Sequence, residues 1–225
     1  MPRAQKGQLI TFEGIDGSGK TTQIQLLKKF LLKKKQKVFV TREPGGAGCP
    51  FAEAVRSLVL NPEYQVHPRS ELLLYEASRA QHVEVTIKPF LLKGYWVLCD
   101  RFTDATLAYQ GGGRNIPGKY LAWLNRFATG NMIPDLTILL DVNVQHGLRQ
   151  ARMISARDTE YAAGAEGDRL EQEDIDFHQR VRRYYLKLAH QHRRIKRIPV
   201  SATVEATHRM IVQTVLKKWP RLGKI

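Results

Sequence analysis

Residues 14–21 read GIDGSGKT and match the pattern G-x-x-x-x-G-K-[ST], whose chemistry is the binding of a nucleoside triphosphate. Glycines let the backbone turn until successive N–H groups point into one concave anion site. Lys20 can reach the β- and γ-phosphates, and the Thr21 hydroxyl can be a ligand of Mg²⁺. The residues expected to bind the triphosphate are Gly14, Ile15, Asp16, Gly17, Ser18, Gly19, Lys20, Thr21 and Thr22.

A glycine-rich turn with a chance lysine is the alternative interpretation. The apolar run before the pattern, residues 8–13, and the helical pattern after it favour the phosphate site.

A second polar candidate, Asp100, ends the apolar run YWVLCD. Ligands of open α/β sheets bind beyond the carboxyl ends of the strands, so Asp100 is expected to organise Mg²⁺ and its waters. An ordinary cap at the end of the strand is the other reading of this residue.

The elements that must position these residues alternate along the chain. Short apolar runs predict strands at residues 8–13, 37–42, 95–100, 136–142 and 197–200. Helical patterns lie between them at residues 20–34, 51–60, 69–93 with a break near Pro89, 103–110, 119–129, 144–155, 173–192 and 204–219. This alternation predicts an α/β fold with three layers, α/β/α, and a central, mostly parallel five-stranded sheet of the P-loop NTPase type.

The composition indicates one globular domain, residues 1–225, with 36 Lys and Arg against 21 Asp and Glu and a net charge of +15. No apolar run reaches the roughly 18 residues of a membrane span, and no signal peptide is recognised, so a cytoplasmic protein is expected. Cys49 and Cys99 make neither a disulfide framework nor a metal site. The basic runs lack interleaved aromatic residues, so we expect solvated helix faces rather than a nucleic-acid surface.

Four further stretches give the sequence a family resemblance. They are TREPGG (41–46), LLLYEASRAQ (72–81), DRFTDATLAYQGGGR (100–114) and DRLE (168–171). Together with the phosphate loop they resemble the bacterial thymidylate kinases, over about residues 9–219. The resemblance implies transfer of the γ-phosphoryl group of ATP to dTMP, with Mg²⁺ as cofactor and a homodimer as the assembly.

The resemblance also implies a site for the acceptor dTMP. Arg101 and Arg56 match arginines at its monophosphate, and a guanidinium group suits phosphate oxygens in bidentate fashion. Tyr75 matches an aromatic residue that stacks on thymine, and Arg79, one helical turn later, matches a contact to the base carbonyl. Without the family, a core aromatic and a surface ion pair would explain this pair of residues. The other implied contacts are Thr106 and Gln110 at the base edge, Tyr109 beneath the sugar, and Asp16, Glu43 and Pro44 near the sugar and phosphate.

A mobile lid is expected at about residues 149–171, with its least regular stretch at 156–167. The phosphate loop has no arginine, and the thymidylate kinases that it resembles take their catalytic arginine from the lid. Arg152 and Arg157 are the candidates, beside Lys20, Arg101 and Asp16 as the other catalytic residues. Positive charge brought up in this way would stabilise the transferring phosphoryl group, although a solvated helix end is the alternative.

The sequence departs from the family pattern in ways that concern selectivity. Glu53 follows Gly46 by seven residues, which suggests a two-residue insertion near Arg56, and Ala105 stands where serine is common. A kinase of another pyrimidine monophosphate such as dUMP is therefore the main alternative. A DNA-binding P-loop ATPase is a distant one, and a GTPase is disfavoured because N-K-x-D is absent.

Overall fold

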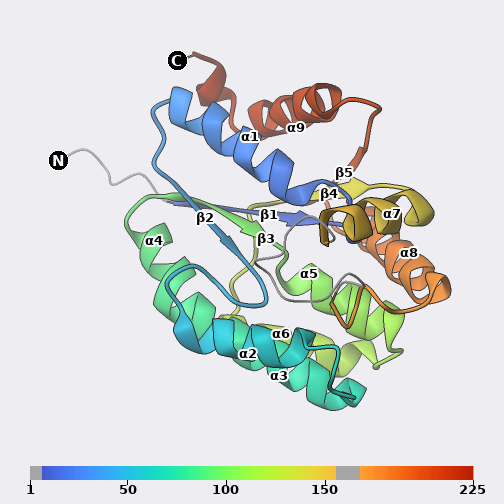
Figure 1. The fold of residues 1–225 in the computed structure, drawn as a ribbon. Coiled ribbons are helices and arrows are strands. Elements are labelled where there is room, and N and C mark those ends of the chain that lie inside the picture. Colours follow the sequence, from blue (N-terminus) through green and yellow to red (C-terminus); the bar gives the residue numbers. More distant parts are fainter. Residues whose placement is uncertain (1–6, 156–167, 225) are drawn as a thin grey trace.

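The computed structural model describes residues 7–155 and 168–224, and its centre is a parallel sheet (Figure 1). The strands of the described chain are β1 (Gln8–Glu13), β2 (Val38–Arg42), β3 (Trp96–Asp100), β4 (Leu136–Asp141) and β5 (Ile195–Pro199). They form one five-stranded sheet in the order β2-β3-β1-β4-β5, and every pairing is parallel. The predicted sheet is therefore confirmed, with no antiparallel member among these strands.

Helices cover both faces of the sheet because the strands bury side chains on both sides. All six residues of β4 are buried, as expected for a central parallel strand. On one face Ile10 and Phe12 of β1 pack with α1 (Lys20–Lys33) and α9 (Val204–Lys218). On the other face Leu139 and Ile195 pack with α8 (Ile175–Gln191). Figure 1 shows these layers above and below the sheet, which is the predicted three-layer arrangement.

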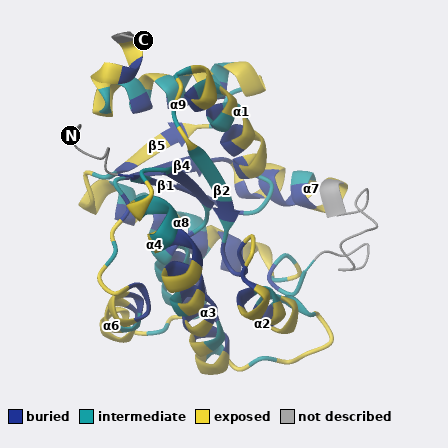
Figure 2. Cartoon of the chain, turned by 90° about the vertical axis from the view of Figure 1, so that its left-hand side faces the viewer, coloured by how far each residue is buried: buried dark blue, intermediate teal, exposed yellow. Residues whose placement is uncertain are grey.

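The remaining helices lie mostly on the α8 side of the sheet (Figure 1). They are α2 (Pro50–Leu60), α3 (Pro68–His82), the π-helical turn η1 (Val83–Ile87), α4 (Lys88–Leu92), α5 (Thr103–Thr106), the π-helical segment η2 (Leu107–Gly113), α6 (Gly118–Thr129) and α7 (Val144–Ser155), and the 3₁₀ turn η3 (Pro220–Lys224) follows α9. Figure 2 shows how their inner sides are buried and their outer sides exposed.

The helical region predicted at residues 69–93 shows no break at Pro89. Helix α3 passes through η1 directly into α4, and Pro89 lies in the first turn of α4. A proline in a regular helix lacks one donor, and its ring clashes with the carbonyl group four residues earlier. The π turn widens the helix just before Pro89, which relieves that clash and keeps the helix continuous.

The glycines at residues 111–113 allow η2 to pack closely against α8. A Cβ atom on Gly113 would lie 2.4 Å from Cε2 of Phe177, and one on Gly112 would lie 2.7 Å from Cβ of Tyr184. The predicted helix at 103–110 thus continues as η2 to Gly113 because no side chain keeps it away from α8. This packing fixes Tyr109 and Gln110, which precede the glycines.

Local sequence explains where α8 begins. Asp174 is its N-cap, and the carboxylate accepts a hydrogen bond from the backbone N of Phe177 at 2.5 Å.

Strand β5 starts at Ile195, two residues before the predicted start, and its last residue is Pro199. Among the described helices none combines the length and the apolar character needed to cross a bilayer.

Candidate active site

A cavity of about 300 Å³ lies beyond the carboxyl ends of β1, β2 and β3. It is the place at which open parallel sheets bind ligands. Among the residues singled out in the sequence, those that line it are Asp16, Gly17, Gly19, Lys20, Thr21, Thr22, Glu43, Pro44, Arg56, Tyr75, Arg79, Asp100, Arg101, Thr106, Tyr109 and Gln110. Asp168 and Glu171 reach it from the last residues of the predicted lid. Residues from six parts of the chain therefore meet at one site.

The phosphate loop closes one end of the cavity. Its glycines take backbone angles that side chains disfavour, with φ of 139° at Gly14, 69° at Gly17 and 86° at Gly19. A Cβ atom on Gly17 would lie only 1.9 Å from the carbonyl oxygen of Gly147. Helix α1 begins at Lys20, so its N-terminal dipole points at the loop. Gly14, Ile15 and Ser18 belong to the loop but do not line the cavity wall.

The Lys20 ammonium group lies over this loop. Nζ donates hydrogen bonds to the carbonyl oxygens of Gly14 at 3.3 Å and Ile15 at 3.1 Å. Burial and the nearby Arg101 lower the pKa of Lys20, while Asp100 and Asp16 oppose that shift. A phosphate chain in the loop would offer this buried cation a stronger partner than two carbonyl groups.

The residues proposed for Mg²⁺ lie side by side. Thr21 Oγ1 donates a hydrogen bond to Asp100 Oδ2 at 3.2 Å. A hydroxyl and a carboxylate are hard oxygen ligands that suit Mg²⁺, which commonly takes one or two protein ligands and completes its shell with water and phosphate. No group of three or more His, Cys, Asp or Glu residues in the described chain could hold a metal by itself. The donor set thus fits a cation that binds together with a nucleotide.

Arg101 connects the phosphate loop to the opposite side of the cavity. Arg101 directly follows Asp100 at the end of β3. Its φ of 65° is in the left-handed region, which is unusual for a residue with a large side chain. Nη2 donates to the carboxylate of Asp16, and Nη1 donates to the carbonyl oxygen of Gly14 at 3.0 Å. Tyr109 donates to the other oxygen of Asp16 at 2.9 Å. Burial opposes ionisation of Asp16, but Arg101 and Lys20 lower its pKa overall.

Arg56 lines the cavity, although the sequence suggests an insertion in the loop before it. Its Nη1 donates to the carbonyl oxygen of Pro44 at 3.0 Å. Glu53 holds the loop between β2 and α2. Its Oε1 accepts a hydrogen bond from the backbone N of Gly46 at 2.9 Å, and its carboxylate pairs with Arg42 at 3.2 Å. These contacts of Glu53 and Arg56 therefore keep Arg56 at the site.

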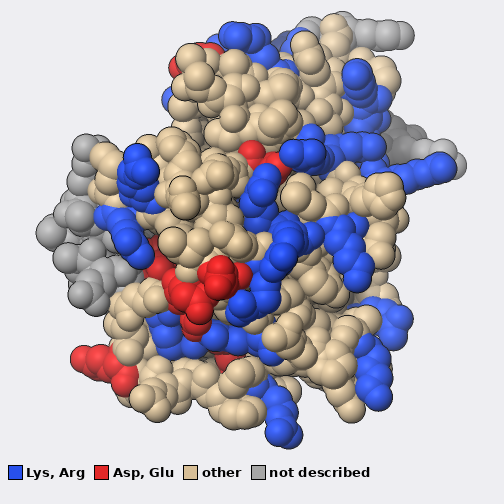
Figure 3. All heavy atoms as spheres, turned by 90° about the vertical axis from the view of Figure 1, so that its right-hand side faces the viewer, with Lys and Arg blue, Asp and Glu red and all other residues tan. Residues whose placement is uncertain are grey.

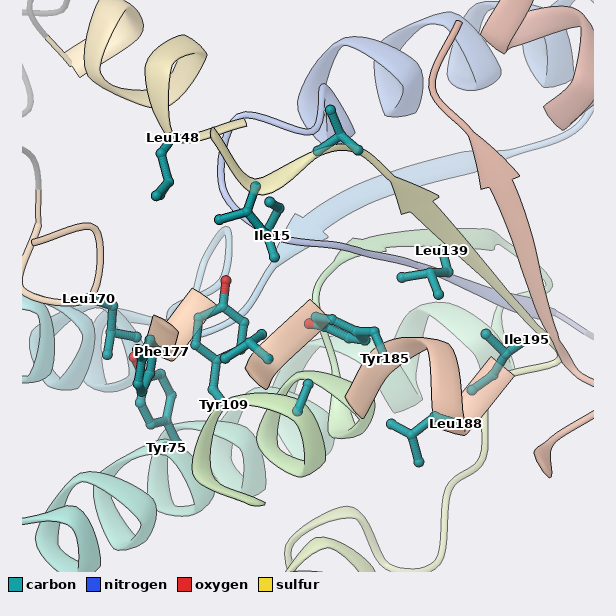
Figure 4. Packing of buried hydrophobic residues seen from close by; sticks show 14 of the residues in the cluster. Ile15, Tyr75, Tyr109, Leu139, Leu148, Leu170, Phe177, Tyr185, Leu188 and Ile195 are labelled. Carbon is teal, nitrogen blue, oxygen red and sulfur yellow. The ribbon is translucent and has the colours of Figure 1, made fainter. Parts of the chain in front are cut away.

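Tyr75 lies at the apolar end of the cavity. Figure 4 shows its ring near Phe177 of α8 and near Leu170, and the three residues belong to one buried cluster. Tyr75 is buried, which raises its pKa well above the ordinary value of tyrosine. The chemistry of this end, with an aromatic ring and aliphatic side chains, suits a flat organic group rather than a phosphate.

Arg79 is a buried arginine that several protein groups hold in place. It is 2% exposed, and its Nε donates to Glu43 Oε2 at 2.7 Å. Its Nη1 donates to Glu76 Oε1 at 2.6 Å, to Thr106 Oγ1 at 2.9 Å and to Asn125 Oδ1 at 2.9 Å. Sequence analysis missed Glu76 and Asn125. An acid one helical turn before a buried arginine was the only local signal for either of them.

Glu13 was also missed, although it is an acid at the end of an apolar strand. It is fully buried, and its Oε1 accepts from the backbone N of Phe102 at 2.8 Å while its Oε2 accepts from the Tyr185 hydroxyl at 2.7 Å. Burial and the neighbouring Asp104 raise the pKa of Glu13 to about 8. Glu13 thus supports the backbone that follows Arg101 from beneath the cavity.

The lid candidates are not gathered at the cavity. Arg152 is exposed on α7, beside Arg149, Met153 and Ile175 in a separate groove, and Arg157 lies outside the described residues, as does the predicted mobile loop 156–167. Asp168 does line the cavity, and its Oδ1 accepts from the backbone N of Leu170 at 2.9 Å. Burial and Asp16 raise the pKa of Asp168.

Parallel strands, a glycine loop at the start of α1 and a mixed charged and apolar cavity define a P-loop nucleotide-binding protein. A family model described as Thymidylate kinase matches residues 12–211, so the chain belongs to the thymidylate kinase family. The thymidylate kinase of Geotalea daltonii is 53% identical over 184 residues, 81% of this chain and 84% of that protein. The thymidylate kinase of Geobacter sp. strain M21 is 46% identical over 220 residues, 97% and 95% of the two chains.

A solved structure supports the fold directly. The crystal structure of thymidylate kinase from Ehrlichia chaffeensis superposes with a TM-score of 0.72 at 31% sequence identity. The match covers 93% of this chain and 99% of that chain. The similarity therefore extends over the sheet and its covering helices rather than the phosphate loop alone.

Proposed function

We propose that the protein is a thymidylate kinase, which transfers the γ-phosphoryl group of ATP to dTMP and yields ADP and dTDP. Family membership supports the reaction class. The observation that carries the proposal is the position of Arg101, whose guanidinium group is fixed to Asp16 of the phosphate loop and lines the same cavity as Lys20. An acceptor phosphate held there meets the end of a donor triphosphate.

The residues divide into a donor side and an acceptor side. Backbone amides of the phosphate loop and Lys20 hold the triphosphate, and Thr21 and Asp100 would hold Mg²⁺, which neutralises charge on the transferring phosphoryl oxygens when it is bound. Arg101 and Arg56 hold the acceptor phosphate in line with the donor. The other assigned contacts to dTMP are those of Asp16, Glu43, Pro44, Tyr75, Arg79, Thr106, Tyr109 and Gln110, all of which line the cavity.

We further propose that the chain is one domain with a lid at about residues 149–171. Arg149 and Arg152 are exposed on α7, in the first described part of this segment. Asp168 and Glu171, in its second described part, line the cavity. Closure of such a segment would bring Arg152 or Arg157 to the phosphates and would exclude water from them. Both arginines remain candidates for the catalytic role.

A homodimer is proposed from the outer surface of α3 and α6. Leu73 is 57% exposed, Trp123 57% and Phe127 75%, and the rings of Trp123 and Phe127 stack at 5.5 Å. These two helices contact each other, and Figure 2 shows the exposed outer sides of both. Adjacent large apolar side chains of this kind are typical of a buried subunit contact.

We also propose a cytoplasmic location and no role in nucleic-acid binding. Cys49 and Cys99 are free buried thiols, as is usual in a reducing compartment. Figure 3 shows that Lys and Arg side chains on one face are interspersed with a group of acidic side chains instead of forming one uninterrupted basic surface. Such a distribution favours a solvated surface.

A coupled ADP-release assay with ATP and either dTMP, dUMP, dCMP or dGMP tests the proposed function. We expect the highest kcat/KM with dTMP. Preference for dUMP would assign the enzyme to another pyrimidine monophosphate. ADP release without a nucleoside monophosphate, stimulated by DNA and lost at high salt, would refute the kinase assignment.

A further inference from the structure

Gln110 is a buried amide whose orientation is set by a residue outside the predicted site. Its Nε2 donates to Glu71 Oε1 at 2.8 Å, and both side chains are buried, with Glu71 0% and Gln110 2% exposed. Glu71 also forms ion pairs with Arg114 Nη2 at 3.0 Å and with Arg169 Nη2 at 2.8 Å. A carboxylate paired in this way offers only acceptors, so the amide must present its NH₂ group to it.

The consequence concerns the other end of the amide. Gln110 lines the cavity, and in the described part of the chain no donor bonds to its Oε1. Because Nε2 is committed to Glu71, the group that Gln110 offers to a ligand is a carbonyl oxygen, which accepts a hydrogen bond and cannot donate one. An amide held only by water or by a hydroxyl could turn over and offer either group.

This acceptor lies at the end of the cavity that suits a base. Glu71 and Tyr75 are four residues apart on α3, so they share one face of the helix, and Gln110 contacts Glu71. The charged groups Arg101 and Asp16 mark the phosphate end. The base of a nucleotide bound at Arg101 would therefore approach Tyr75 and Gln110.

We propose that Glu71 is a positioning residue for base selection: it fixes the Gln110 amide so that the site prefers pyrimidines that carry a hydrogen on N3. Thymine and uracil donate from N3–H. Cytosine has an acceptor at N3, which would face the Gln110 oxygen without a hydrogen between them, and a buried unpaired acceptor is costly. This inference rests on the proposed function, because it assumes that a nucleoside monophosphate occupies the cavity.

Replacement of Glu71 by glutamine tests the proposal. The new amide can donate or accept, so Gln110 becomes free to turn over. We expect the ratio of kcat/KM for dTMP to that for dCMP to fall about 10- to 100-fold, as expected for one hydrogen bond in a desolvated pocket. The ratio for dTMP to dUMP should stay unchanged, because both bases carry N3–H.

Glu173→Gln is the matched control. Glu173 pairs with the same Arg114 at 2.5 Å but does not contact Gln110 in the described structure. This variant loses an ion pair to the same arginine, from a side chain that is 26% exposed, while the partner of the amide stays in place. We expect its dTMP to dCMP ratio to equal that of the wild type, and an equal loss of selectivity in both variants would overturn the proposal.

The double variant Glu71→Gln/Gln110→Met separates positioning from a general structural effect. If Glu71 acts through Gln110, its replacement changes nothing further once the amide is gone, so the double variant and Gln110→Met should show the same reduced ratio. An additional loss in the double variant, or wild-type selectivity in Glu71→Gln, contradicts the inference. Thermal unfolding shows whether Glu71→Gln is folded. If it is not, Gln110→Met still tests the inference, because an unchanged dTMP to dCMP ratio in that variant rules out the acceptor role of Gln110 on which Glu71 would act.

The wild-type enzyme distinguishes this inference from the proposed function. Absence of activity with dTMP refutes the proposed function. Activity with dTMP together with equal activity on dCMP leaves the kinase assignment intact and refutes base selection through Gln110.

Discussion

Lys20 stands where the phosphate loop passes into α1, and its ammonium group is held by two loop carbonyls. Replacement by alanine removes the side-chain cation of the donor site. We expect kcat to fall by about 10²–10³-fold or more, because a positioned charge in such a site stabilises the transition state strongly. A coupled assay measures this, and circular dichroism should show an intact fold. Lys29→Ala, an exposed change on the same helix, should behave as wild type, and near wild-type turnover in Lys20→Ala would refute the role.

Glu13 gives a second prediction at the residue scale. Its pKa is about 8 in the folded protein against an ordinary value of 4.5, so the folded state retains a proton that the unfolded chain releases. Its contribution to stability is full below the unfolded pKa and is lost as the pH rises toward 8. Relative to Glu13→Gln, the free energy of unfolding of the wild type should fall by about 1 kcal/mol per pH unit between about pH 5 and about pH 8. Urea unfolding at several pH values measures this difference, and parallel curves for the two proteins would contradict the shifted pKa.

At the scale of elements, the proposed lid should carry the catalytic arginine. We expect Arg157→Ala or Arg152→Ala to lower kcat by about 10³-fold, with a smaller change in KM, since the group acts on the transition state. Steady-state kinetics of both variants identifies which arginine acts. Arg149→Ala, on the exposed part of α7, is the control for a simple change of charge. A rise in KM alone in both variants would show that these arginines only bind a substrate.

The contact between η2 and α8 allows a test of packing. Gly113→Ala would place a methyl group 2.4 Å from the Phe177 ring, so the two elements must separate. Overpacking of this kind costs about 1–3 kcal/mol, and thermal or urea unfolding measures it. Gly118→Ala is the matched control, because its Cβ atom would lie 4.0 Å from the nearest neighbour, the Tyr184 hydroxyl. Equal stabilities of the two variants would contradict the tight packing.

At the scale of the whole molecule, the apolar surface of α3 and α6 should be a subunit contact. A glutamate in place of Phe127, which is 75% exposed, would put a charge into that contact, so Phe127→Glu should be monomeric where the wild type is dimeric. Sedimentation velocity measures the change. Leu32→Glu alters an exposed apolar residue on α1, beyond the opposite face of the sheet, and should leave the dimer intact. A monomeric wild type would refute the assembly.

The sequence by itself determined the phosphate loop, the order of strands and helices, and the residues that end strands at the site. These features depend on local chemistry: glycine conformations, the alternation of apolar runs, and the rule that parallel strands point their carboxyl ends to one edge. The family resemblance added Arg101, Arg56 and Tyr75 to this site, and the structure places all three at the cavity wall.

Only the tertiary structure decided which polar groups hold the site residues in place. Glu71 meets Gln110 across 39 positions of sequence, Glu13 meets Tyr185 across 172, and Asn125 meets Arg79 across 46. Such partners carry no local pattern, because the packing of whole helices against the sheet brings them together and burial then favours the pairing of polar atoms. The sequence therefore specified which residue types meet at the site, whereas the packed fold fixed which way their side chains offer donors and acceptors.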